Sequence, residues 1–131
     1  MRNDNVNHPS HYTSGPFECI ELTSRYPFLG GNAIKYVYRW QGKNGLEDLR
    51  KALWYLNRAK EESPYEPLGL YPLDSFVPPY CYFHMDDESV HMLRKLARLN
   101  WQNMRGFWKG MSELACDHKS GYTRAKKTLE R

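Results

Sequence analysis

Residues 46–62, LEDLRKALWYLNRAKEE, carry the clearest secondary-structure pattern in the chain. Leucines recur in it every three or four residues, at Leu46, Leu49, Leu53 and Leu56. This spacing is typical of an amphipathic helix with one buried face. Asn44, followed three residues later by Glu47, resembles a capping box at the start of such a helix. We therefore predict a helix over 46–62.

Two shorter helices are predicted before it. Residues 17–26 carry apolar positions at helical spacing and stop before Pro27, which cannot continue a helix. Residues 33–40, AIKYVYRW, follow a predicted turn at Gly30-Gly31-Asn32. In this second helix Lys35 and Arg39, four residues apart, share a face.

The second half begins with an irregular segment. Residues 63–85 are rich in proline and tyrosine, and they predict a connector without regular helix. From residue 86 onward one stripe with a spacing of three or four residues predicts a single long helix, weakened at Gly106 and Gly110, with a frayed tail over 118–131. The stripe is Leu93, Ala97, Asn100, Met104, Phe107, Met111 and Leu114.

The predicted fold is therefore mainly α: a small helical domain over 1–62, an aromatic, proline-rich connector over 63–85, and a helical extension over 86–131. The extension is more apolar than a lone surface helix needs, so we expect it to pack against the first domain or against a second subunit. A homo-oligomer is the expected assembly.

Composition narrows the class of partner. Apolar residues make up 40% and charged residues 26% of the chain, and no long apolar run or signal-peptide pattern is present, so we expect an intracellular protein without a membrane partner. The three cysteines predict reduced thiols rather than a disulfide framework. A net charge of +4 suits phosphate-bearing ligands, either nucleotides or nucleic acid, without choosing between them.

The first candidate site is HPSHY, in which His8 and His11 are followed by Tyr12. Paired histidines can bind a metal, donate hydrogen bonds to phosphate, or act as acid and base. The alternative is a pair of solvated loop histidines.

The second candidate is the Gly30-Gly31-Asn32 turn with the basic residues Lys35 and Arg39 beyond it, and Lys43 in the next turn. Backbone amides at a helix start favour anions, and cationic side chains add charge for phosphate oxygens. The alternative is a glycine turn followed by an ordinary basic face. No GxxxxGK[ST] pattern is present, which excludes a P-loop as a sequence match.

The third candidate is Glu47 and Asp48, whose carboxylates can hold Mg²⁺ beside substrate phosphates. The alternative is compensation of the helix dipole, with a Glu47 to Lys51 ion pair. The spacings of Cys81 with His84 and of Cys116 with His118 do not match a structural zinc motif.

Together these motifs resemble a domain common in tailed phages, the nucleotide kinase family named after podophage early-gene deoxynucleoside monophosphate kinases. The resemblance covers about residues 5–60 and rests on HPSHY, on GN-x-x-KY-x-x-R over 31–39, and on EDL-x-KA-x-WYL over 47–56. In many genomes this domain is described only as of unknown function. The resemblance implies transfer of the ATP γ-phosphoryl group to a deoxynucleoside monophosphate with Mg²⁺, in the host cytoplasm.

We assign roles on that basis from the chemistry of the side chains. Lys35, Arg39 and Lys43 would contact phosphate oxygens, as would the amides of Gly31 and Asn32. His8 and His11 would clamp a phosphate or move a proton. Tyr12 and Tyr36 would stack a base. Glu47 or Asp48 would hold magnesium or its waters.

Two alternatives remain open. Glu18-x-x-Glu21 and Glu47-Asp48 partly match the carboxylates of an all-helical nucleotide pyrophosphohydrolase, although Arg50 stands where the last Asp of its ExxD motif belongs. The other alternative is a non-catalytic phage early protein that binds nucleotide, nucleic acid or a host protein. No helix-turn-helix, RNP motif or basic stripe is visible in the sequence to favour nucleic acid.

Overall fold

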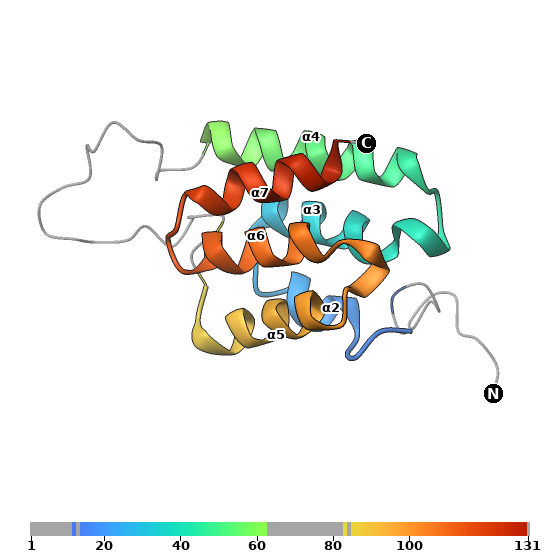
Figure 1. The fold of residues 1–131 in the computed structure, drawn as a ribbon, viewed down its shortest axis with the longest axis horizontal. Helices are drawn as coiled ribbons and strands as arrows, with labels where there is room; N and C mark the ends of the chain where they lie inside the picture. Colours follow the sequence, from blue (N-terminus) through green and yellow to red (C-terminus); the bar gives the residue numbers. More distant parts are fainter. Residues whose placement is uncertain (1–11, 13, 63–82, 84, 131) are drawn as a thin grey trace, which may run out of the picture.

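The computed structural model describes residues 12, 14–62, 83 and 85–130. Within these residues every regular element is a helix, which confirms the mainly α prediction (Figure 1). Most of the predicted connector, residues 63–82 and 84, lies outside the described residues. None of the described helices has the length and apolar character that crossing a membrane requires.

The first half is a helical pair preceded by a short helix. The elements are α2 (Cys19–Thr23), α3 (Phe28–Arg39), the 3-10 turn η1 (Trp40–Gly42) and α4 (Leu46–Glu62). The short link at 43–45 makes α3 and α4 neighbours, because a brief connection returns the chain along the helix it has just left. Helix α4 begins and ends where the sequence predicts.

The predicted turn at Gly30-Gly31-Asn32 is wrong, because α3 already begins at Phe28 and all three residues lie inside it. The Gly31 amide donates to the carbonyl of Pro27 at 2.9 Å, within the helix. A side chain at Gly31 would place its Cβ 3.1 Å from the Thr23 carbonyl oxygen. Glycine here allows the chain after α2 to lie tightly against α3.

The predicted single long helix in the second half is also wrong. The chain forms α5 (Asp87–Arg98), the 3-10 turn η2 (Trp101–Asn103) and α6 (Arg105–Ala115). Asn100, with φ 51°, has the left-handed conformation that ends helices and that asparagine tolerates better than most residues. Its side-chain oxygen accepts a hydrogen bond from the Arg105 amide at 2.9 Å, so it also caps α6.

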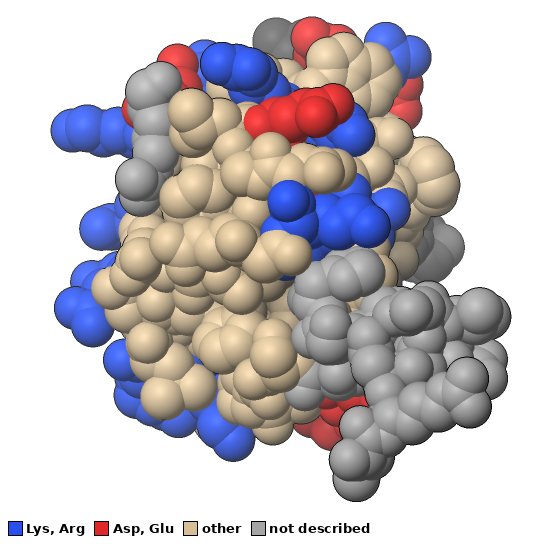
Figure 2. All heavy atoms as spheres, turned by 90° about the vertical axis from the view of Figure 1, so that its right-hand side faces the viewer, with Lys and Arg blue, Asp and Glu red and all other residues tan. Residues whose placement is uncertain are grey.

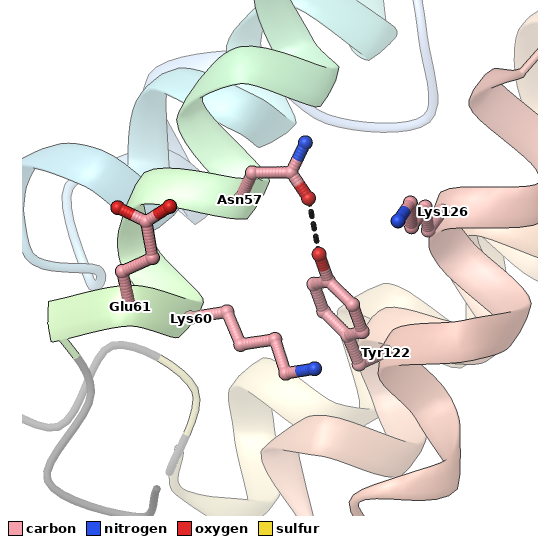
Figure 3. A pocket seen from close by; sticks show the side chains of 5 residues that line it. All are labelled: Asn57, Lys60, Glu61, Tyr122 and Lys126. Atoms are coloured by element: carbon pink, nitrogen blue, oxygen red, sulfur yellow. Dashed lines mark hydrogen bonds between the residues drawn. The ribbon is translucent and has the colours of Figure 1, made fainter.

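The tail predicted to fray is instead an ordered helix, α7 (Ser120–Leu129), with Ala125 and Leu129 buried. In Figure 1 it lies across α6 and beside α4. The contact with α4 includes a hydrogen bond from the Tyr122 hydroxyl to the side-chain oxygen of Asn57, drawn in Figure 3. Lys60 on α4 places its ammonium group 4.1 Å from the centre of the Tyr122 ring.

The core joins the two halves around Tyr38 of α3 and Trp108 of α6, both fully buried. The Tyr38 ring lies 5.3 Å from Trp101 and 6.4 Å from Trp108, between ring centres. The indole nitrogen of Trp101 donates to the Tyr38 carbonyl at 3.2 Å, and that of Trp40 donates to the Gln102 carbonyl at 2.7 Å. The helical extension therefore packs on the first half through polar as well as apolar contacts.

Helices α6 and α7 meet where Gly110 faces Gly121. A Cβ at Gly110 would lie 2.5 Å from the Gly121 carbonyl oxygen, and one at Gly121 would lie 2.9 Å from the Leu114 nitrogen. These atoms are backbone, so they cannot move aside as a flexible side chain would.

Gly121→Ala is expected to destabilise the protein by about 1–3 kcal/mol, because the added methyl group forces the two helices apart. Urea denaturation followed by circular dichroism measures this change. Thr123→Ala, at an exposed position of the same helix, is the matched control and should leave the free energy of unfolding unchanged or slightly higher. Equal stability of the two variants would contradict the close crossing.

Candidate functional site

Cationic and aromatic side chains gather between α3 and α4 in a group that we call the Tyr36 cluster: Lys35, Tyr36, Arg39, Lys51 and Tyr55. The Tyr36 ring centre lies 4.5 Å from the Lys35 nitrogen, 4.7 Å from the Arg39 guanidinium carbon and 5.5 Å from the Lys51 nitrogen. Tyr36 also stacks on Tyr55 at 5.8 Å with 16° between the planes. Three cations thus surround one aromatic ring, which attracts positive charge through its face.

Arg39 is held firmly in this cluster. One guanidinium nitrogen donates to Asp48 at 3.1 Å and another donates to the Tyr12 hydroxyl at 2.7 Å. The Arg39 side chain is 12% exposed and Asp48 is fully buried, so this is a desolvated ion pair. Burial opposes the charge on Arg39, but the hydrogen bonds to Asp48 and Tyr12 outweigh it and raise the pKa of the guanidinium group. Burial also raises the pKa of Tyr12.

Asp48 has a second structural bond, because it accepts from the backbone amide of Asn44 at 3.1 Å. It therefore joins the end of α3 to the start of α4 and fixes the connection between them. Figure 2 faces this end of the molecule, where basic and acidic side chains lie next to one another among uncharged atoms.

A shallow hollow of about 180 Å³ lies beside the cluster, at the junction of α2 and α3. Gly31, Asn32 and Lys35 line it together with the ring of Phe28, which is 73% exposed. Lys35 thus belongs to both the hollow and the cluster. The hollow is smaller than pockets that enclose a drug-sized ligand, so it has room for one group such as a phosphate or a base.

The predicted amide cradle for phosphate is wrong at Gly31, because that amide is already bonded to Pro27 within α3. Asn32 likewise bonds its own helix, with its side-chain nitrogen 3.0 Å from the Phe28 carbonyl. Gly31 and Asn32 instead form part of the wall of the hollow, beside Lys35.

The two predicted metal ligands do not converge. Asp48 points inward to Arg39, whereas the Glu47 side chain is 64% exposed and lies 3.6 Å from the Lys51 nitrogen. Across the described ranges no group of three His, Cys, Asp or Glu side chains is close enough to hold a metal ion together. Glu18 and Glu21 form the capping box of α2, which leaves that pair no converging arrangement with the α4 carboxylates.

The structure thus brings Tyr12, Tyr36, Arg39 and Asp48 into one contact network, with Lys35, Gly31 and Asn32 at its border. Lys43 is exposed after η1, and Glu47 faces solvent. His8 and His11 lie outside the described residues.

Three residues at the site were not predicted: Lys51, Tyr55 and Phe28. Lys51 and Tyr55 are four residues apart on α4, so they share a face, and that spacing is a signal the sequence did contain. Phe28 had no such signal, because the predicted turn placed it outside α3.

Cys19 lies beneath the cluster and is 3% exposed. Burial raises the pKa of its thiol to about 12, although Lys35 and Arg39 oppose the shift. The thiol is therefore protonated and unreactive at neutral pH.

Asp48→Ala should destabilise the protein by about 3 kcal/mol, because it leaves the desolvated Arg39 charge without its partner. Asp48→Asn keeps an acceptor for the Asn44 amide and should cost less. Urea denaturation of both variants at pH 7 measures the difference. If both variants matched the unmodified protein, the buried ion pair would not be stabilising this connection.

The raised pKa of the Cys19 thiol also predicts that the folded protein loses stability at alkaline pH. Above pH 9 the unfolded chain loses the Cys19 proton while the folded chain keeps it, so the unfolded state binds fewer protons and stability falls with rising pH. The slope is at most about 1.4 kcal/mol per pH unit. Denaturation midpoints measured between pH 8 and 10 should fall less steeply for Cys19→Ala than for the unmodified protein, and parallel slopes would contradict this assignment.

One comparison with known proteins bears on this site. A family model described as a protein of unknown function, DUF3310, matches residues 6–57. No curated protein and no solved structure matches the chain significantly. The matched range begins two residues before HPSHY, ends in α4, and includes every residue of the Tyr36 cluster. Over these residues, and not over α5 to α7, the chain is similar to that family.

Proposed function

We propose that this protein is a nucleotide kinase without a Walker A loop, which binds its nucleotide at the Tyr36 cluster and the adjoining hollow. The supporting observation is the set of three cations, Lys35, Arg39 and Lys51, around one aromatic ring beside a hollow. Nucleotides combine phosphate charge with a flat aromatic base, so a cationic and aromatic surface matches both parts of the ligand.

Within this proposal the two lysines contact phosphate oxygens. Lys51 is 41% exposed, and its weak pairing with Glu47 at 3.6 Å in a solvated position is easily exchanged. Lys35 lines the hollow. Phosphoryl transfer depends mainly on positioning and on neutralising charge on the transferred group, and two ammonium groups can supply that neutralisation.

Arg39 takes a positioning role. Its charge is already shared with Asp48 and Tyr12, so it orients Tyr12 and Tyr36 rather than binding the phosphate as a free cation. The base would rest on the exposed aromatic surface of Phe28 and Trp54, which are 73% and 59% exposed and both pack edge-on against Tyr55.

Of the two carboxylates predicted to hold magnesium, Glu47 is the one available for the ion. Mg²⁺ in kinases is held by one or two carboxylates together with substrate phosphates and waters, and Glu47 is exposed enough to take part, whereas Asp48 is occupied. The ion would neutralise charge between the phosphates. His8 and His11, just before Tyr12 in the sequence, would clamp a phosphate or accept the proton of the attacking group.

The test is product analysis by mass spectrometry after incubation with ATP, Mg²⁺ and each deoxynucleoside monophosphate separately. Diphosphate should form, and kcat/KM should fall roughly 10- to 150-fold in Lys35→Ala and in Lys51→Ala, equivalent to one lost charged hydrogen bond each. Lys127→Ala, at an exposed position of α7, removes the same charge elsewhere and should retain full activity. Arg39→Ala is unsuitable because it would leave Asp48 unpaired.

Other products would redirect the assignment. Monophosphate released from a triphosphate would replace the kinase with a pyrophosphohydrolase. Saturable nucleotide binding without any diphosphate would leave a non-catalytic nucleotide-binding protein.

A further inference from the structure

A second basic surface lies in the other half of the molecule, in a groove between α5 and α6. Its volume is about 560 Å³. Four exposed cations line it, together with Ala97, Ser112 and Glu113: Arg94 and Arg98 from α5, and Arg105 and Lys109 from α6. We call this the α5–α6 groove.

The groove has an excess of positive charge. Residues 89–112 contain five Lys or Arg residues and no Asp or Glu. The carboxylate at its edge, Glu113, already accepts from the Arg124 guanidinium at 2.9 Å, so its charge is balanced by a cation of α7. In Figure 2 basic side chains gather along the left margin, which is the face turned to the viewer in Figure 1, where α5, α6 and α7 lie.

The spacing of the cations along each helix is electrostatically unfavourable. Arg94 and Arg98 are four residues apart, as are Arg105 and Lys109, and like charges at this spacing repel one another on a helix surface. Arg105 directs its Nε to the Ala97 carbonyl at 3.2 Å, so its position relative to α5 is defined. An anion placed between the two rows would relieve both repulsions.

The spacing of the cations suits a series of phosphates. One helical turn separates the two residues in each row by about 6 Å, and packed helix axes are about 8–10 Å apart. A duplex carries one charge per roughly 1.7 Å of its axis, so such a patch faces several phosphates at once.

We propose that the α5–α6 groove binds the phosphate backbone of a nucleic-acid duplex. Among the residues that the structure describes, those lining the groove include no aromatic side chain, whereas surfaces for single strands combine cations with aromatic rings on which unpaired bases stack. A duplex hides its bases and presents phosphates, which is what this lining can contact. Binding is therefore independent of sequence.

The groove is also preformed. Leu93 and Leu96 of α5 and Phe107 and Met111 of α6 are fully buried beneath it, so the two helices are fixed before a ligand arrives. Little conformational entropy is then lost from the backbone on binding.

The test is fluorescence anisotropy with a labelled 20-base-pair DNA duplex of arbitrary sequence across a salt series. If all four cations contact phosphates, the slope of log K against log salt concentration should be about −3.6. The double variant Arg94→Gln, Arg98→Gln should make this slope less steep by about 2 and weaken binding. The double variant Arg50→Gln, Arg58→Gln on α4 removes the same net charge from the opposite edge of the helical layer and should bind like the unmodified protein (Figure 1).

Three further measurements distinguish a duplex from other phosphate-bearing ligands. The same assay is repeated with a single strand of equal length, and competition is measured with tripolyphosphate and with ATP. The proposal would be overturned if the Arg94 and Arg98 variant kept the duplex affinity and salt slope of the unmodified protein. It would also be overturned if the α4 control lost as much duplex affinity as that variant. Groove-dependent binding of tripolyphosphate or single strand, with no duplex binding, would also overturn it. Circular dichroism confirms that each variant is folded, and Lys35→Ala, which removes a kinase-site cation, should retain duplex binding.

Discussion

The arrangement of the whole molecule depends on tryptophan side chains that bond the backbone around Tyr38. Trp101 donates to the carbonyl of Tyr38, Trp40 to that of Gln102, and Trp108 to that of Trp101 at 2.9 Å. The first two bonds join α3 and η1 to η2, parts of the chain that are more than sixty residues apart. The third bond joins α6 to η2. An indole buries a large apolar area and still needs one acceptor, which makes each contact both strong and directional. The last turn of α3, with Arg39 next to Tyr38, is thereby fixed.

That fixed end explains why Arg39 has a structural role as well as a functional one. A buried guanidinium contributes only if its charge is paired, since desolvation is costly and a lost partner leaves a bare charge. Tyr12 supplies one partner from the N-terminal segment and Asp48 another from α4. The site and the fold therefore share residues, and the cations left free for a ligand are the more exposed Lys35 and Lys51.

The sequence predicted the fold where the periodicity was regular. Residues 46–62 form a helix with the predicted ends, because one strong leucine face and clear end signals coincide. The prediction failed at Asn100, which keeps the spacing of the stripe in the sequence but adopts a left-handed conformation and caps the following helix. It also failed at Gly30 and Gly31, where glycine serves close packing inside a helix rather than a turn.

The candidate site was partly predictable for a related reason. Lys35, Tyr36 and Arg39 are close in sequence on one helix, so their proximity was predictable. The burial of Asp48 against Arg39 depends on how α4 packs on α3, which no local pattern reveals. The α5–α6 groove shows the same limit more strongly. Its cations are spaced four, seven and four residues apart, which would place them on one face of the single helix that was predicted. They lie instead on two packed helices, and no local pattern reveals that this packing forms a groove.

The four tryptophans divide into two optical classes. Trp40, Trp101 and Trp108 donate hydrogen bonds to carbonyls at the junction of the two halves, where Trp108 is buried and the other two are half-buried. Trp54 is 59% exposed and touches Tyr55 at the border of the Tyr36 cluster. Its emission is the part accessible to a dissolved quencher such as iodide, so the protein has a built-in reporter at the site, separate from the signal of its folded core.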